Sequence, residues 1–376
     1  MGFTLDNVRK LLPIYFVLLL TFASPAQAGA ESPAPRGFIG ISPQGKSDIS
    51  DFELMQLAGI ESMRVPMSWA QIEPQPEDVR EPHWGYFDEA VAGAAEHGMR
   101  VFPFLGGTPE WVAPFPTAEP VESAWQRRAW KRFLGDAVRR YGPGGEFWEE
   151  NPDLPSLPIR RWEIWNEENI ITFSHHPSPE RFARLIRISG RLLHRVDPGA
   201  QAIVGGLFGR PLQVPPNVRS GDFLSRLYRA KRVKRFFDGV ALHPYVARAG
   251  AMRAQIRNLR RVMRVHNDAD TPLYVTELGW GSDSFESRWE RGWLGQAREL
   301  DSAFAMLTAN RRSWRIGGVW WFSWTDELGA CQFCDSAGLL THGREAKPAW
   351  YAFNAWTGGD AETVPRASAA GLLGAP

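Results

Sequence analysis

The sequence predicts an α/β protein with one main domain, a (β/α)8 (TIM) barrel over residues 37–357. After residue 36 the chain alternates eight times between a short apolar run and an amphipathic stretch. Strands separated by helices pair in parallel, because a parallel connection needs a long crossover. Eight such units in about 320 residues match the size of a barrel. A doubly wound open sheet is the alternative, but no Gly-x-Gly-x-x-Gly run opens the chain.

In the first half of this domain, four apolar runs are each followed by a stretch with helical periodicity. Asp48 stands where its side chain can cap the first helix. In the fourth helix Phe182, Leu185 and Leu193 fall on one face, as in an amphipathic helix. The expected strands are Gly37–Ser42, Ser62–Ser68, Arg100–Leu105 and Arg161–Trp165, and the expected helices are Asp48–Ala58, Phe87–His97, Ala124–Tyr141 and Pro179–Val196.

The second half repeats the same pattern. The pair Gly205-Gly206 follows the fifth apolar run, and we interpret it as a turn rather than a phosphate-binding loop. Residues 358–376 are expected to form a flexible C-terminal tail. The expected strands are Ala202–Gly205, Gly239–Leu242, Leu273–Thr276 and Gly318–Phe322, and the expected helices are Phe223–Ala230, Arg253–His266, Gln296–Asn310 and Pro348–Trp356.

The N-terminus has the pattern of a secretory signal. Arg9 and Lys10 precede an apolar run at Leu11–Phe22, and Ala-Gln-Ala follows at 26–28. We predict a signal peptide over residues 1–28, a linker over 29–36, and a secreted protein that is extracellular, periplasmic or attached to the cell wall. Because a membrane span needs about 20 apolar residues, an uncleaved anchor is the weaker alternative. No stable membrane insertion is expected after cleavage.

Two cysteines, Cys331 and Cys334, follow the eighth strand. In an exported protein this close pair predicts a disulfide. A zinc site is the alternative, but it would need four ligands and the chain has no second cysteine pair.

Composition narrows the class of partner. The net charge is +1 and no long basic or acidic run occurs, which argues against nucleic acid. The chain contains 17 Trp and 22 Phe, whose flat faces can stack on sugar rings or fill a large core. A carbohydrate is therefore the expected partner.

Two glutamates stand at the ends of predicted strands. Glu167 ends the fourth strand and Glu277 ends the seventh. Barrel enzymes place their chemistry at the C-terminal ends of the strands, where these two side chains can face each other. Two carboxyl groups about 5–5.5 Å apart suit a retaining glycosidase, which needs a nucleophile and an acid/base but no metal or organic cofactor. A solvated strand end is the alternative for either glutamate alone.

Glu168 and Glu163 are the rival carboxylates. Glu168 is expected to point into solvent from the loop. Glu163 shares strand parity with Glu167, so it should point into the barrel, where it needs a cationic partner such as Arg64.

The motifs around the two glutamates resemble those of clan A glycoside hydrolases, in particular families 39 and 5. The run WEIWNEEN resembles their Trp-Asn-Glu-Pro motif, with Glu168 at the position where proline is common, and YVTELGW resembles their nucleophile strand. The resemblance covers residues 37 to about 357. It implies that Glu167 is the acid/base and Glu277 the nucleophile.

The same resemblance implies further site residues. SMRVPMSW resembles the second strand of these families and carries over Arg64, while ALHPY resembles the sixth and carries over His243 and Tyr245. Arg64 by its charge and Tyr245 by a hydrogen bond should keep the nucleophile ionised. Asn166 can donate to the sugar 2-hydroxyl. His243 either lines the site or is a buried histidine satisfied by the backbone.

Three tryptophans are candidates for sugar stacking. The family resemblance favours Trp324, after the eighth strand, for the catalytic subsite. Trp321 is the competitor, because a shift of one residue moves a side chain to the other face. Trp111 is expected either to form a second platform or to pack in the core.

These observations together predict a secreted retaining glycoside hydrolase that acts without metal or cofactor. The alternative is a barrel that binds polysaccharide but has lost catalysis. The sugar and the choice between endo and exo cleavage depend on loops at residues 70–86, 107–122, 206–222 and 281–295.

Overall fold

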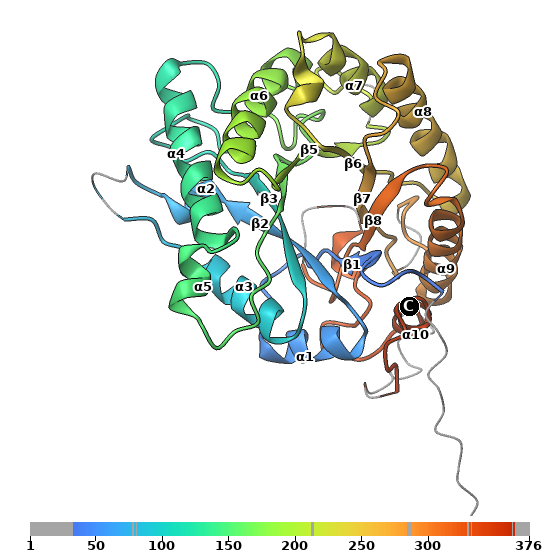
Figure 1. The fold of residues 1–376 in the computed structure, drawn as a ribbon. Coiled ribbons are helices and arrows are strands. Elements are labelled where there is room, and N and C mark those ends of the chain that lie inside the picture. Colours follow the sequence, from blue (N-terminus) through green and yellow to red (C-terminus); the bar gives the residue numbers. More distant parts are fainter. Residues whose placement is uncertain are drawn as a thin grey trace, which may run out of the picture. The chain divides into compact units, whose positions relative to one another are not determined.

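The computed structural model describes residues 33–76, 79, 81–211, 214–283, 287–328, 331, 333–362 and 364. Eight parallel strands form a closed barrel in the order β1 to β8, which confirms the predicted fold (Figure 1). The strands are β1 (Ile39–Ile41), β2 (Ser62–Ser68), β3 (Arg100–Gly106), β4 (Arg161–Ile164), β5 (Gln201–Phe208), β6 (Gly239–His243), β7 (Leu273–Leu278) and β8 (Ile316–Trp321).

The helices lie outside the ring of strands (Figure 1). Every predicted helix is present, and the short helices α2 and α5 and three 3-10 turns are additional. The helices are α1 (Ile49–Leu57), α2 (Trp69–Ile72), α3 (Gly85–Glu96), α4 (Ala124–Tyr141), α5 (Glu146–Glu150), α6 (Pro179–Val196), α7 (Ser220–Arg229), α8 (Met252–Val265), α9 (Trp293–Asn310) and α10 (Pro348–Thr357). The 3-10 turns are η1 (Val233–Arg235), η2 (Ala249–Ala251) and η3 (Cys334–Ser336).

Side chains at the helix starts explain where several helices begin. Asp48 caps α1 as predicted: its carboxylate accepts from the Asp51 amide, and the Asp51 carboxylate accepts from the Asp48 amide. Ser123 and Gln126 form the same reciprocal arrangement at α4. Such a capping box satisfies amide groups that the first helical turn leaves unpaired.

The interior of the barrel is filled by large aromatic side chains. Trp320 of β8 packs against Phe102 and Tyr274, with ring centroids 5.1 and 6.3 Å away. Glycines on neighbouring strands provide the room: a Cβ at Gly40 would lie 2.5 Å from Trp320, and a Cβ at Gly239 would lie 2.5 Å from Tyr274. The barrel is therefore a packed core, and its interior has no room for a substrate.

The interpretation of Gly205-Gly206 as a turn is wrong. Both residues lie inside β5, next to a register shift between Val204 and Leu207. A Cβ at Gly205 would lie 2.6 Å from a Glu168 oxygen, and a Cβ at Gly206 would lie 1.9 Å from His243. These glycines serve close packing rather than a change of chain direction.

The predicted signal peptide (1–28) and most of the predicted linker (29–36) lie outside the described residues, as does most of the predicted tail (358–376). These boundaries stay predictions. Among the described helices, none combines the length and the apolar character needed to cross a bilayer.

Candidate active site

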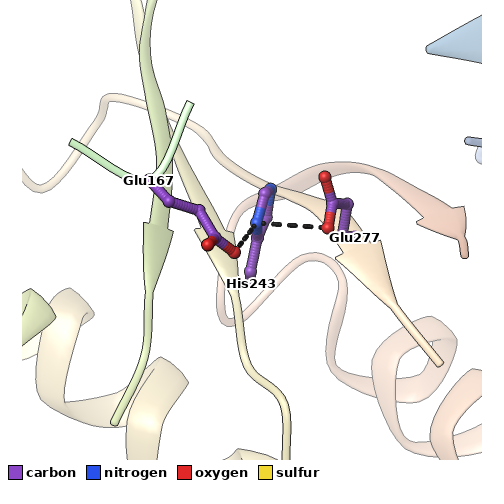
Figure 2. Close-up of side chains that lie close together, drawn as sticks. All are labelled: Glu167, His243 and Glu277. Carbon is purple, nitrogen blue, oxygen red and sulfur yellow. Dashed lines mark hydrogen bonds and ion pairs between the residues drawn. The ribbon is translucent and has the colours of Figure 1, made fainter. Parts of the chain in front are cut away.

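The two strand-end glutamates converge at the barrel mouth. A carboxylate oxygen of Glu167, one of Glu277 and a ring nitrogen of His243 all lie within 4.8 Å of one another, and the imidazole stands between the two carboxyl groups (Figure 2). This proximity matches the short carboxyl separation of retaining glycosidases, about 5–5.5 Å, rather than the 6.5–9.5 Å of inverting ones.

The backbone that follows β4 takes an uncommon conformation on both sides of Asn166. Trp165 has a φ of 75° and Glu167 a φ of 45°, both in the left-handed region. Such conformations cost about 1–3 kcal/mol each in non-glycine residues and persist where the surrounding structure holds them.

Glu277 on β7 receives two strong donors. Arg64 Nη1 lies 2.6 Å from its Oε1, and the Tyr245 hydroxyl donates to its Oε2 at 2.7 Å. Donors to a carboxylate stabilise its charged form. Burial, followed by the charge of Glu277, raises the pKa of Tyr245 well above its ordinary value, so the phenol stays protonated and able to donate.

Arg64 organises the floor of the site from β2. Its Nε and Nη2 pair with both oxygens of Glu163, at 2.8 and 2.9 Å, and both side chains are fully buried. Glu163 thus points into the barrel, as predicted. Arg64 Nη2 also donates to Asn166 Oδ1 at 2.8 Å, so the Asn166 amide NH2 group is left as the donor available to a substrate.

Glu167 has a different environment from Glu277. Its Oε1 lies 2.7 Å from His243 Nδ1, and its side chain is 6% exposed. Burial, reinforced by the negative charge of Glu277, raises the pKa of Glu167 well above its ordinary value. Burial and the charge of Arg64 lower the pKa of His243 well below its ordinary value. The site therefore combines an imidazole whose neutral form is favoured, a carboxyl group whose protonated form is favoured, and a second carboxyl group that accepts from two donors.

The fold is similar to those of several solved glycoside hydrolases. The chain is similar to a family 39 glycoside hydrolase from Bacteroides cellulosilyticus WH2, with 18% identity, a TM-score of 0.63, and coverage of 87% of this chain and 64% of that one. A family 39 β-xylosidase from Caulobacter crescentus has 18% identity, a TM-score of 0.60, and coverage of 87% of this chain and 72% of that one. A glucosidase from Croceicoccus marinus has 16% identity, a TM-score of 0.64, and coverage of 86% and 67%.

The chain has the fold of family 39 glycoside hydrolases. It spans slightly less than two thirds of the length of the Bacteroides enzyme. No protein-family model matches the sequence, and no curated protein matches it either. The likeness is therefore one of fold, and the reaction has to be argued from the residues at the barrel mouth.

The prediction that Glu168 points into solvent is wrong. Its side chain is fully buried, and neither carboxyl oxygen has a hydrogen-bond partner among the described residues. One of these oxygens packs over Gly205 of β5. Burial raises the pKa of Glu168 well above its ordinary value, which favours its protonated form. Glu168 is not among the residues that line the cleft, which removes it as a rival for the role of Glu167.

The stacking prediction for Trp324 is also wrong. Trp324 is 2% exposed, its indole N–H donates to Asp51, and its ring meets Trp350 edge-on at 5.7 Å. Its competitor Trp321 is fully buried against Trp280 and Phe304. Both rings lie in the hydrophobic core.

Trp111 takes the core alternative. It is half-buried, its indole N–H donates to the Glu73 carbonyl, and its ring meets Trp69 edge-on at 5.9 Å. Trp111 is not among the residues that line the catalytic cleft.

Other aromatic residues take the place of these tryptophans. A cavity of about 480 Å³ contains both glutamates and is lined by Phe322, Phe333 and Trp289. Phe322 directly follows β8 and is the sequence neighbour of Trp321. Because neighbouring side chains of a strand point to opposite faces, this alternation is the sequence signal that indicates Phe322 for the cleft once Trp321 is placed in the core. Trp289 lines the cavity through its ring, while its indole N–H is buried away from it, without a partner among the described residues.

Cys331 and Cys334 form the predicted disulfide, with their Cα atoms 5.2 Å apart. Both cysteines line the same cavity as Glu277. Phe333, between them, contacts the Tyr245 ring edge-on at 5.3 Å. The bridge therefore fixes a segment that forms part of the cleft wall.

Glu167, His243 and Glu277 are also the kind of group that could hold a metal ion. However, the guanidinium of Arg64 is already 2.6 Å from Glu277. A fixed positive charge at that distance opposes a second cation at the same carboxylate. The donor set thus fits proton transfer better than metal binding.

Proposed function

We propose that the protein is a secreted retaining glycoside hydrolase that cleaves O-glycosidic bonds of an oligosaccharide or polysaccharide by double displacement. Glu277 is the nucleophile and Glu167 the acid/base. The observation that carries this proposal is the contrast between two neighbouring carboxyl groups. Glu277 has Arg64 and Tyr245 to stabilise its charge, whereas Glu167 is buried beside a like charge that favours its protonated form.

In the first step a Glu277 oxygen bonds to the anomeric carbon while the bond from that carbon to the glycosidic oxygen breaks. The proton of Glu167 passes to the departing oxygen. In the second step Glu167, now a carboxylate, takes a proton from water. The water oxygen bonds to the anomeric carbon, and Glu277 leaves as a carboxylate.

The electrostatics of the pair support this exchange of roles. The charge of Glu277 contributes to the raised pKa of Glu167. Once Glu277 is esterified to the sugar, that charge is gone and the pKa of Glu167 falls. The same residue is thereby a suitable acid in the first step and a suitable base in the second.

His243 can hold Glu167 in the geometry that proton transfer needs. Its Nε2 lies 3.1 Å from the Thr276 hydroxyl, and its Nδ1 lies 2.7 Å from Glu167 Oε1. If Thr276 donates to Nε2, then Nδ1–H donates to Oε1. Glu167 Oε2 is then the atom that carries the acidic proton.

The shape of the cleft favours a chain as substrate. A further cavity of about 200 Å³ shares Pro66, Phe104, Asn166 and Phe173 with the catalytic cavity. Sugar units on both sides of the scissile bond therefore have space to bind. The predicted signal peptide and the disulfide support export.

The alternative proposal is a barrel that binds polysaccharide without cleaving it. Both carboxylates and the Arg64 and Tyr245 donors are in place, which favours the hydrolase.

The test is to incubate the protein with activated 2-deoxy-2-fluoro glycosides of several sugars and to locate any bound sugar by mass spectrometry. We expect one sugar on Glu277, and products that retain the anomeric configuration by NMR. Glu168→Gln, which changes a carboxyl outside the cleft, should label like the wild type. Labelling on Glu167, or inversion of configuration, would refute the assigned roles.

A further inference from the structure

A second and larger cavity, of about 850 Å³, lies over α7 and α8 and the C-terminal end of α9. We refer to it as the arginine groove. No Asp or Glu occurs among its described lining residues. Six arginines line it: Arg210, Arg219, Arg257, Arg260, Arg261 and Arg264.

The arginines of α8 form a regular row. Arg257, Arg261 and Arg264 are exposed and follow one another at helical spacings of four and three residues. At a rise of 1.5 Å per residue they stand about 5 Å apart along the helix axis. None of these three arginines forms a salt bridge with a described residue. By contrast, Arg226 of α7 pairs with Glu180 of α6. Like charges at this spacing destabilise a helix, so the row does not serve stability.

A fourth arginine of the groove is buried. Arg260 is 4% exposed and donates to the Ala269 and Thr271 carbonyl oxygens, without a salt bridge to a described carboxylate. Burial and the nearby charges of Arg264 and Arg315 lower its pKa, against a smaller opposing effect of Tyr228 and Asp268. A buried cation that forms no salt bridge is costly. An anion bound in the groove would offset that cost.

The other lining groups suit a sugar. Gln255, Asn258 and Asn310 supply amides, and Trp314 supplies an aromatic ring. Amides pair with hydroxyl groups, and guanidinium groups pair with carboxylates through two parallel hydrogen bonds. A polymer that carries both hydroxyl and carboxylate groups therefore matches this lining better than a simple phosphate.

The groove begins next to the catalytic cleft. Phe208 lines the cleft, and the following residue, Gly209, lines the groove. Gln255 in the groove donates to the backbone oxygen of Tyr245, at 3.4 Å, and Tyr245 holds Glu277. A chain that leaves the cleft over Phe208 would reach Arg210 and then the row on α8.

We propose that the arginine groove binds the carboxylate groups of an acidic polysaccharide whose scissile bond lies in the cleft. The link between the groove and the cleft rests on the proposed glycosidase function. The inference assigns the substrate to the anionic polysaccharides that contain uronates.

The test measures binding to the full-length Glu277→Gln protein by calorimetry. The probes are alginate oligomers, which carry one carboxylate per sugar, and neutral xylo-oligosaccharides of the same length. Combining Glu277→Gln with Arg257→Gln, Arg261→Gln and Arg264→Gln should weaken alginate binding at least tenfold at 50 mM salt and flatten its salt dependence. Xylo-oligosaccharide binding should change less than twofold.

The α4–α6 surface offers a matched control. Lys131, Arg191 and Arg195 are exposed and line a separate basic cavity of about 420 Å³. Replacing these three by Gln also removes three positive charges, and it should leave alginate affinity within twofold. Equal losses in both triple variants would show general charge attraction and overturn the proposal. So would unchanged affinity in the groove variant, or tighter binding of a DNA duplex than of alginate.

Two further readouts keep the outcomes distinct. Thermal unfolding shows whether each triple variant folds. If one does not, the single variants Arg257→Gln and Arg264→Gln should each weaken alginate binding by more than twofold. Unchanged alginate binding in these single variants would contradict the proposal. Alginate binding that depends on the groove, in a wild-type protein that hydrolyses no glycoside, would leave the groove standing and refute the proposed function. Glycoside hydrolysis by a protein whose alginate binding does not depend on the groove would leave the proposed function standing and refute the groove proposal.

Discussion

Replacing Glu167 by glutamine separates the two carboxyl groups by function. The substitution keeps the size of the side chain, and the new amide can either accept from or donate to His243 Nδ1, which lies 2.7 Å from Glu167 Oε1 in the wild type. It removes a carboxyl group whose charged form is disfavoured by burial and by the nearby charge of Glu277. We therefore expect Glu167→Gln to fold as well as the wild type and to lose proton transfer.

The expected loss depends on the leaving group. General acid catalysis contributes roughly 10²–10⁴-fold, which corresponds to about 3–5 kcal/mol of barrier at 1.36 kcal/mol per tenfold. A substrate with a poor leaving group should lose this full amount. A dinitrophenyl glycoside needs little protonation, so its first step should survive, and the glycosyl-enzyme should accumulate because no base activates water.

The assay is a stopped-flow burst of dinitrophenolate release, with and without azide, followed by mass spectrometry. Azide needs no deprotonation, so it should restore turnover in Glu167→Gln and yield a glycosyl azide. Glu277→Gln should give neither a burst nor an adduct, and Glu168→Gln, next in the chain but outside the cleft, should behave like the wild type. Full activity in Glu277→Gln, or an adduct on Glu168, would refute the assignment.

Three further predictions concern other positions. Tyr245→Phe removes a hydrogen bond to a charged carboxylate, worth about 1.5–3 kcal/mol, so kcat/KM on aryl glycosides should fall by roughly 10- to 150-fold; an unchanged value would place the nucleophile elsewhere. Burial raises the pKa of Glu168, so the stability that this acid contributes is present below its unfolded pKa of about 4.3 and is lost as pH rises through the folded pKa. Glu168→Gln should therefore unfold at a higher temperature than the wild type at pH 8 but not at pH 4, and equal shifts at both would contradict a raised pKa. Trp324→Ala should cost about 3–5 kcal/mol of stability in denaturant unfolding and change KM less than twofold; a raised KM with unchanged stability would restore its stacking role.

The barrel could be predicted because its signals are local. Strands such as Ser62–Ser68 are short apolar runs between polar loops, helices such as Pro179–Val196 carry a helical periodicity, and the structure gives both the predicted bounds. In a barrel the C-terminal ends of all strands meet at one mouth. The position of Glu167 and Glu277 at strand ends therefore indicated their convergence without any knowledge of the loops.

The sequence could not decide which side of the barrel wall each neighbouring side chain occupies. Strands buried on both faces are apolar throughout, so alternation does not distinguish inside from outside. A shift of one residue separates Trp321 in the core from Phe322 in the cleft. For the same reason the burial of Glu168 was missed, since it depends on space over Gly205 on the next strand.

The sequence by itself determined the order of the elements, the helix cap at Asp48, the close cysteine pair and the two strand-end glutamates, because each depends on neighbours in the chain. Tertiary structure alone decided which aromatic residues line the cleft and how Arg64 bridges Glu163 and Glu277. It also placed the arginines of α8 in one groove with Arg210 and Arg219. These features join residues tens to hundreds of positions apart, and their energies arise from packing and charge at distances of a few ångströms that only the folded barrel creates.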